Sequence, residues 1–181
     1  MRKLLLALCL ATALSATSAI QEKPYLEPGK DAPTFSLKGS DGKSYDLAKM
    51  REDKSAFVLF WKQRCPHNAR AAQIYNKLVQ TYKGVPFVGV VNTDEAGAKA
   101  WAEQFSTAYP MLPDADKALI KGYKLQASIA AFEIGKDGKV VAVFGGYGSE
   151  AIDKLNKAMA AAAKVPAASL DTGAPARETW G

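Results

Sequence analysis

The sequence predicts an α/β fold in which a central mixed β-sheet carries helices on both faces. Two continuous apolar runs, Ala56–Trp61 and Phe87–Val91, have the length of strands buried on both sides, and a stretch with helical periodicity separates them. Two further strand-like runs, 128–134 and 140–144, are joined by a turn that contains Asp and Gly at 137–138, which is typical of a hairpin. A strand–helix–strand–helix order followed by an antiparallel hairpin and a closing helix indicates a mixed sheet.

Composition indicates one globular domain. The 181 residues are 48% hydrophobic and 23% charged, which excludes general disorder. The net charge of +6 comes from scattered lysines, so nucleic-acid binding is not expected. One histidine and two cysteines leave too few side chains for a metal site rich in those ligands. No nucleotide-binding glycine pattern is present, and we expect no cofactor.

The first 19 residues have the three parts of a secretory signal peptide. A positive start at 1–3 precedes an apolar stretch at 4–14 and small residues that end at Ala19. The apolar stretch is too short for a stable membrane span, although an uncleaved anchor is the alternative. Cleavage after Ala19 removes Cys9 and leaves Cys65 as the one cysteine of a secreted or periplasmic protein.

The remaining chain divides into three parts. An extended lead-in is predicted over 20–28, a folded domain over 29–164 and a flexible tail over 165–181, where prolines and glycine occur without periodicity.

Within the domain, the elements follow from local patterns. A hairpin is predicted from 34–37 and 43–45, and a helical turn over 47–50. The buried strand at 56–61 is followed by a helix from Pro66 to Gly84, the strand at 87–91 and a helix capped by Thr93 or Asp94. A loop with Pro110 and Pro113 then leads to a short helix over 116–122, the second hairpin and a last helix capped by Ser149.

Cys65 is the candidate catalytic residue. It follows a buried strand and precedes Pro66, and proline at the first helical position places Cys65 at the N-cap. The free backbone N–H groups and the helix dipole favour a thiolate there, and Arg64 and His67 add positive charge. An inert buried cysteine is the alternative, but the polar residues before Cys65 indicate that the strand has left the core. Trp61 is expected to pack in the core or beside the site.

Seven segments resemble a known superfamily. They are Gly29-Lys30-Asp31-Ala32-Pro33-Thr34-Phe35-Ser36-Leu37, Asp41-Gly42-Lys43, Phe57-Val58-Leu59-Phe60-Trp61, Cys65-Pro66, Gly122-Tyr123-Lys124-Leu125, Phe132-Glu133-Ile134 and Lys136-Asp137-Gly138-Lys139. Together they resemble the thioredoxin-like redoxin superfamily, which includes peroxiredoxins (the alkyl hydroperoxide reductase/thiol-specific antioxidant group, AhpC/TSA) and secreted thiol-disulfide reductases. The resemblance covers about 29–164 and implies a thioredoxin-like fold with a redox-active cysteine at Cys65.

Three positions depart from the patterns of that superfamily. Residues 65–68 read Cys-Pro-His-Asn, so Asn68 stands where a Cys-x-x-Cys motif has its resolving thiol. No proline occurs near Ile129, where the superfamily places a cis-proline, and a cis bond without proline is not expected. Peroxiredoxins have Thr or Ser three residues before their cysteine and Pro seven before it, whereas this chain has Lys62 and Val58.

Two functions remain open at this point. The first is an extracytoplasmic thiol redox protein in which Cys65 performs thiol–disulfide exchange or peroxide-linked oxidation, and an external thiol resolves the product. Arg64 and His67 would tune the sulfur, and Asn68 would hydrogen-bond to it. The partner would be a thiol or disulfide of a protein or small molecule, or a peroxide. The alternative is a catalytically degenerate thioredoxin-fold domain that serves for binding or as a scaffold.

Overall fold

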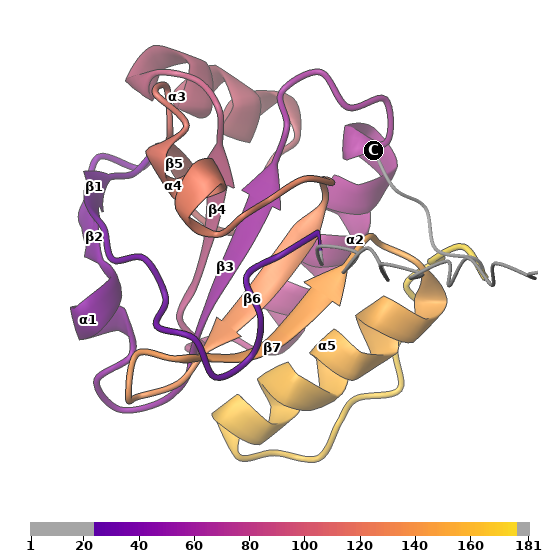
Figure 1. Ribbon diagram of the computed structural model, residues 1–181. Helices are drawn as coiled ribbons and strands as arrows, with labels where there is room; N and C mark the ends of the chain where they lie inside the picture. The colour runs from indigo at the N-terminus through magenta and orange to yellow at the C-terminus, as the bar shows by residue number, and fades with distance from the viewer. Residues whose placement is uncertain (1–23, 177–181) are drawn as a thin grey trace, which may run out of the picture.

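The computed structural model describes residues 24–176, and the predicted signal peptide lies outside them. The elements are β1 (Ser36–Lys38), β2 (Ser44–Asp46), α1 (Leu47–Met50), β3 (Ala56–Trp61), α2 (Asn68–Thr81), β4 (Phe87–Val91), α3 (Glu95–Gln104), β5 (Met111–Pro113), α4 (Ala118–Gly122), β6 (Ala130–Ile134), β7 (Val140–Gly145) and α5 (Ser149–Ala163). Figure 1 shows the larger sheet at the centre, with α5 along β7 and the β1–β2 hairpin at the opposite side.

The central sheet is mixed and has the strand order β5-β4-β3-β6-β7. β3 pairs in parallel with β4, and β4 in parallel with β5, while β6 pairs antiparallel with both β3 and β7. Every residue of β3 and β4 is buried. This burial explains their continuous apolar runs, because a strand covered on both faces has no solvent side. The predicted mixed sheet is confirmed.

Two hydrophobic cores lie on the two faces of this sheet. Along β3, Phe57, Leu59 and Trp61 join the core under α2, α3 and α5. Val58 and Phe60 join the second core, which is covered by α1, α4 and the segment that precedes β1. Because alternate side chains of a strand point to opposite faces, one apolar run supplies both cores. Helices on both faces, as predicted, therefore follow directly from the pattern of β3.

Several short elements agree with local sequence rules, and others do not. Asp94 caps α3 and accepts a hydrogen bond from the Gly97 N–H at 2.8 Å, as predicted. By contrast, β5 lies in a stretch expected to be a loop, and α4 begins at Ala118 rather than near 116. Ser149 is not the cap of α5: it is the first helical residue, and Gly148 is the N-cap.

The described part of the predicted flexible tail, 165–176, packs against α2 and α5. The Ala168 N–H donates to the Tyr82 hydroxyl at 2.9 Å, and the Asn156 side-chain amide donates to the Ala168 carbonyl at 2.9 Å. Leu170 packs on the core between these helices. Side chains from other parts of the chain therefore hold the segment at its backbone, and isolated apolar contacts add to this.

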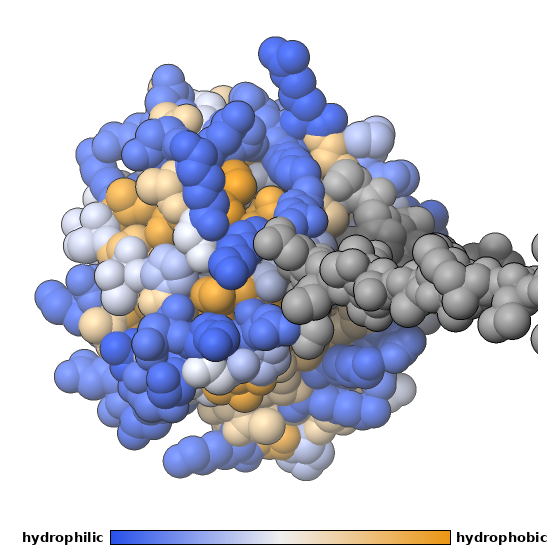
Figure 2. Space-filling view, viewed as in Figure 1, coloured by the Kyte–Doolittle hydropathy of each residue, from blue (hydrophilic) through white to orange (hydrophobic). Residues whose placement is uncertain are grey.

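The surface of the described residues carries few large apolar side chains. Figure 2 shows a face that is mostly hydrophilic, with hydrophobic residues in separate patches. Val141 and Val165 are the exposed large hydrophobic residues in 24–176. Within the same range no helix is both long and apolar enough to cross a membrane.

Candidate thiol site

Cys65 lies in the loop between β3 and α2, where its thiol is free and half-buried. Its backbone N–H donates to the Lys62 carbonyl at 3.1 Å, and its carbonyl accepts the Asn68 N–H at 3.2 Å. These two bonds form two consecutive turns before the helix begins. The N-cap of α2 is therefore His67, and the prediction that Cys65 occupies that position is wrong. Pro66 lies in the second turn instead of at the first helical position.

Asn68 is buried and fixes this loop. Its side-chain amide donates to the carbonyls of Lys62 and Gln63, at 3.0 and 3.3 Å. An amide group has two N–H donors, so both are used on the backbone of the loop. The sequence-based expectation that Asn68 bonds to the sulfur is not met, since its donors face the carbonyls before Cys65.

The basic residues near Cys65 have different surroundings. Arg64 is exposed. The Lys62 ammonium donates to the Gln126 carbonyl at 2.9 Å, which ties the loop to the segment before β6. His67 Nδ1 lies 3.0 Å from the hydroxyl of Tyr147, which belongs to the loop between β7 and α5. Arg64 alone of these three extends into solvent without a described partner.

Sequence reasoning missed the distant residues that hold the loop. Gln126 and Tyr147 come from remote loops, and no local signal indicates them. Asn92 is the exception: it directly follows β4, and its side-chain carbonyl accepts the Gln63 N–H at 2.8 Å. Because the carboxyl ends of neighbouring parallel strands meet at one edge of a sheet, a polar residue just after β4 is a recognisable candidate.

The peptide bond between Ser128 and Ile129 is cis, and the expectation of a trans bond is wrong. Both residues are buried just before β6, and the Ile129 carbonyl accepts the Gly146 N–H at 2.6 Å. The cis geometry thus occurs where the resemblance places a cis-proline, without a proline.

Two hollows meet at Cys65. The first lies between α2 and α3, has a volume of about 390 Å³ and is lined by Gln63, Arg64, Cys65, Pro66, Asn68, Ala69, Gly97, Ala100, Trp101, Gln104 and Phe105. The second has a volume of about 340 Å³ and is lined by Lys62, Gln63, Arg64, Cys65, Pro66 and Asn92. We call them the α2–α3 hollow and the Asn92 hollow. The loop residues 63–66 line both, so a disulfide could approach Cys65 from either side.

Trp61 packs in the core beneath the site. Its ring centroid lies 4.8 Å from that of Trp101 and 5.7 Å from that of Tyr75. Burial raises the pKa of Tyr75 well above its ordinary value, so the hydroxyl stays protonated and donates to the Gly146 carbonyl at 2.8 Å. Trp61 thus supports Trp101, which forms a wall of the α2–α3 hollow, and it lines neither hollow itself.

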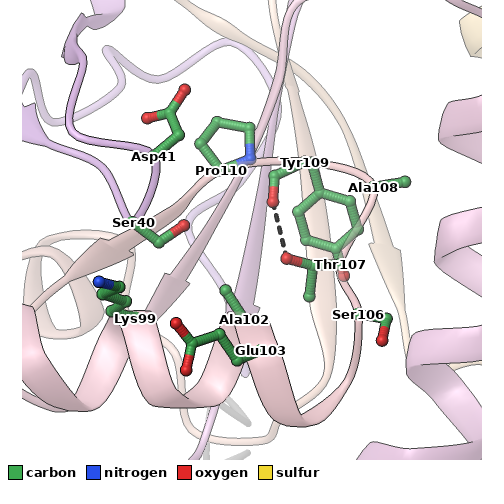
Figure 3. A pocket seen from close by; sticks show the side chains of 10 residues that line it. All are labelled: Ser40, Asp41, Lys99, Ala102, Glu103, Ser106, Thr107, Ala108, Tyr109 and Pro110. Atoms are coloured by element: carbon green, nitrogen blue, oxygen red, sulfur yellow. Dashed lines mark hydrogen bonds between the residues drawn. The ribbon is translucent and has the colours of Figure 1, made fainter.

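A third hollow, on the opposite face of α3, carries no thiol (Figure 3). Its volume is about 390 Å³, and Lys99 and Glu103 of α3 line it together with Ser40 and Asp41. Across the described residues, no three His, Cys, Asp or Glu side chains are placed to hold a metal ion.

The fold and site define the class of protein: a thioredoxin-like fold with one thiol in the loop after the central strand. The AhpC/TSA family model matches residues 28–143, and the chain belongs to this family. It is 30% identical over 152 residues to the thiol-disulfide oxidoreductase ResA of Geobacillus thermodenitrificans, covering 81% of this chain and 86% of that protein. The corresponding protein of Bacillus cereus is 28% identical over 142 residues, covering 76% and 82%.

Solved structures agree with the fold. The peroxidoxin BcpB of Mycobacterium tuberculosis matches with a TM-score of 0.61 at 20% identity, covering 78% of this chain and 99% of that one. A secreted disulfide oxidoreductase of the same organism matches with a TM-score of 0.58 at 23% identity, covering 70% and 95%. At these identities the likeness concerns the fold alone.

Proposed function

We propose that the protein is an extracytoplasmic thiol redox protein in which Cys65 exchanges with disulfides and an external thiol resolves the product. The observation that carries the proposal is the free, half-buried Cys65 that lines two hollows. The names of the relatives, thiol-disulfide oxidoreductases, support the same chemistry. The signal-peptide pattern at 1–19 supports a secreted or periplasmic location.

The reaction proceeds in two exchanges. The Cys65 thiolate attacks one sulfur of a disulfide, a new S–S bond forms, and the other sulfur leaves as a thiolate with the bonding electron pair. Asn68 has no sulfur with which to attack the mixed disulfide. A second thiol from solution attacks the partner's sulfur, forms a new disulfide with it and releases the Cys65 thiolate.

The loop anchors keep Cys65 in place during both steps. Asn68 fixes the loop from its own helix, and Lys62 and Gln63 tie it to Gln126 and Asn92. This support holds the sulfur at the junction of the hollows whichever partner is attached. Peroxide chemistry has less support, since Lys62 replaces the hydroxyl that peroxiredoxins place there and donates its ammonium to a carbonyl.

One observation favours a second candidate, a binding or scaffold domain without turnover. Asn68 occupies the position of a resolving cysteine and serves the loop instead. A chain that keeps its loop rigid and lacks the second thiol is also suited to holding a partner non-covalently.

Adduct formation distinguishes the two functions. The chain lacking residues 1–19 is incubated with glutathione disulfide, and its mass is followed with time. We expect one mixed disulfide on Cys65 that persists until reduced glutathione is added, and none on Cys65→Ser. A native protein that forms no adduct, while the denatured protein does, would favour the scaffold function.

A further inference from the structure

Resting on this proposed function, we propose that the α2–α3 hollow selects the partner of Cys65 and that the partner is a short, anionic cysteinyl peptide. Its cysteine forms the mixed disulfide with Cys65, and the rest of the peptide occupies the hollow. Four properties of the hollow support this assignment: its walls, its unpartnered polar atoms, its charge and its size.

Part of the wall of the hollow is apolar and well supported. Trp101 and Phe105 pack with their ring centroids 4.4 Å apart, and Trp101 also packs on the buried Trp61. Ala69 of α2 and Ala100 of α3 complete the apolar lining. Such walls bind the aliphatic parts of a peptide by removing them from water.

Two polar atoms of the lining residues have no hydrogen-bond partner within the described chain. They are the Oδ1 of Asn68 and the Nε1 of Trp101, and both side chains are only 3% exposed. One is an acceptor and the other a donor, which matches the N–H and the carbonyl of a peptide group. Both atoms are shielded from water, so the lining must adjust for a ligand to reach them. The ligand then supplies hydrogen bonds to these two atoms, which water does not reach.

The charge of both hollows is positive. Arg64 lines both of them, Lys62 lines the Asn92 hollow, and neither lining contains Asp or Glu. A cleft with charges of one sign favours ligands of the opposite sign, so the partner carries net negative charge.

The size of the site indicates a small ligand. A volume of about 390 Å³ lies at the lower end of the range for small-molecule sites, about 300–1,000 Å³. A peptide of two or three residues fits this range. The Asn92 hollow, on the other side of the loop, remains open for the second thiol that attacks the partner's sulfur.

The first experiment compares three disulfides by the rate of adduct formation. Glutathione disulfide has peptide groups and negative charge, hydroxyethyl disulfide is neutral and lacks peptide groups, and cystamine is cationic. Each rate is divided by the rate for an uncharged small-molecule thiol, which removes the intrinsic reactivity of each disulfide. We expect a normalised preference for glutathione disulfide over hydroxyethyl disulfide of about tenfold, and cystamine to be slowest.

Two variants and one control test the residues. Trp101→Phe keeps an aromatic side chain in the wall and removes the N–H donor together with part of the ring, and Arg64→Gln removes the positive charge. Each should lower the glutathione disulfide rate by about three- to tenfold more than it lowers the hydroxyethyl disulfide rate, so that the ratio of the two rates falls. The matched control Lys99→Gln removes a positive charge from the opposite face of α3, where Figure 3 shows it, and should change neither rate.

The outcomes distinguish failure of the proposed exchange function from failure of the peptide assignment. If no disulfide reacts with native Cys65, the proposed function fails. If all three disulfides react at equal normalised rates, the peptide assignment fails while the exchange function stands. If an unfolded protein bearing disulfides reacts much faster than glutathione disulfide, the partner is a macromolecule and the assignment to a short peptide is overturned.

Discussion

Asn68→Cys is the most informative single substitution, because it adds a resolving thiol and removes the anchor of the loop. The Asn68 N–H donates to the Cys65 carbonyl, so residues 65–68 form one turn. The first and last Cα atoms of such a turn lie less than about 7 Å apart. Disulfides form between Cα atoms about 4.4–6.8 Å apart, so the new thiol lies within reach of Cys65.

The cost of the substitution follows from two hydrogen bonds. Asn68 donates to the carbonyls of Lys62 and Gln63, and a typical hydrogen bond contributes about 0.5–1.5 kcal/mol to the free energy of unfolding. Asn68→Cys therefore lowers the stability of the reduced protein by about 1–3 kcal/mol. For a chain of this size, each kcal/mol corresponds to about 2–4 °C in the melting temperature.

The assay measures reduction of insulin disulfides and the lifetime of the glutathione adduct by mass spectrometry. We expect faster insulin reduction and a shorter adduct lifetime in Asn68→Cys than in the wild type, because the second thiol attacks the mixed disulfide within the molecule. Asn68→Ala is the matched control, since it loses the same two hydrogen bonds and gains no thiol.

The reasoning is refuted by either of two results. Equal insulin reduction by the wild type and Asn68→Cys would mean that resolution is not the missing step. A gain in Asn68→Ala equal to that in Asn68→Cys would mean that release of the loop, and not the added sulfur, governs the rate.

Three further predictions concern stability. Cys65→Ser should shift the melting temperature by no more than about 2–4 °C, equivalent to ~1 kcal/mol, because the cysteine is half-buried and serine is similar to it in size. A larger drop would show that the cysteine has a structural role. Burial raises the pKa of Glu133, and a hydrogen bond from Ser55 partly opposes this rise. The stabilisation linked to the raised pKa is therefore present at low pH, where the carboxyl group is protonated, and is lost as the pH rises through the raised pKa. Glu133→Gln should therefore raise the melting temperature at pH 7 and not at pH 3, and equal shifts at both values would contradict this. Truncation after Lys164 should lower the melting temperature, since the packed segment 165–176 is lost, and an unchanged value would show that its contacts contribute nothing.

Elements whose whole length follows one hydrophobic pattern were predictable from the sequence. β3 and β4 are buried at every residue, so their continuous apolar runs leave no other assignment. The hairpin of β6 and β7 has both an apolar pattern and an Asp-Gly turn. In contrast, β5 has only three residues and ends at Pro113, and it depends on pairing with β4. No local pattern identifies a strand that is stabilised mainly by its neighbour.

The tail and the start of α2 show a second limit of sequence reasoning. The backbone of Ala168 is bound by Tyr82, the residue that ends α2, and by Asn156 of α5. A rule based on proline, glycine and periodicity cannot detect such binding. At α2, proline at the first helical position was a sound local expectation, but Asn68 binds the loop carbonyls and two turns form first.

The corrected start of α2 changes the physical account of Cys65. With His67 at the N-cap, the position of the thiol depends on the loop and its anchors rather than on helix capping. Asn92 and Gln126 each bind one residue of that loop, and Asn68 binds it from the helix. These anchors come from three separate elements and leave the Cys65 side chain exposed to two hollows. The resemblance therefore indicated Cys65 as the candidate nucleophile, whereas the tertiary structure determines from which sides a partner can reach its thiol.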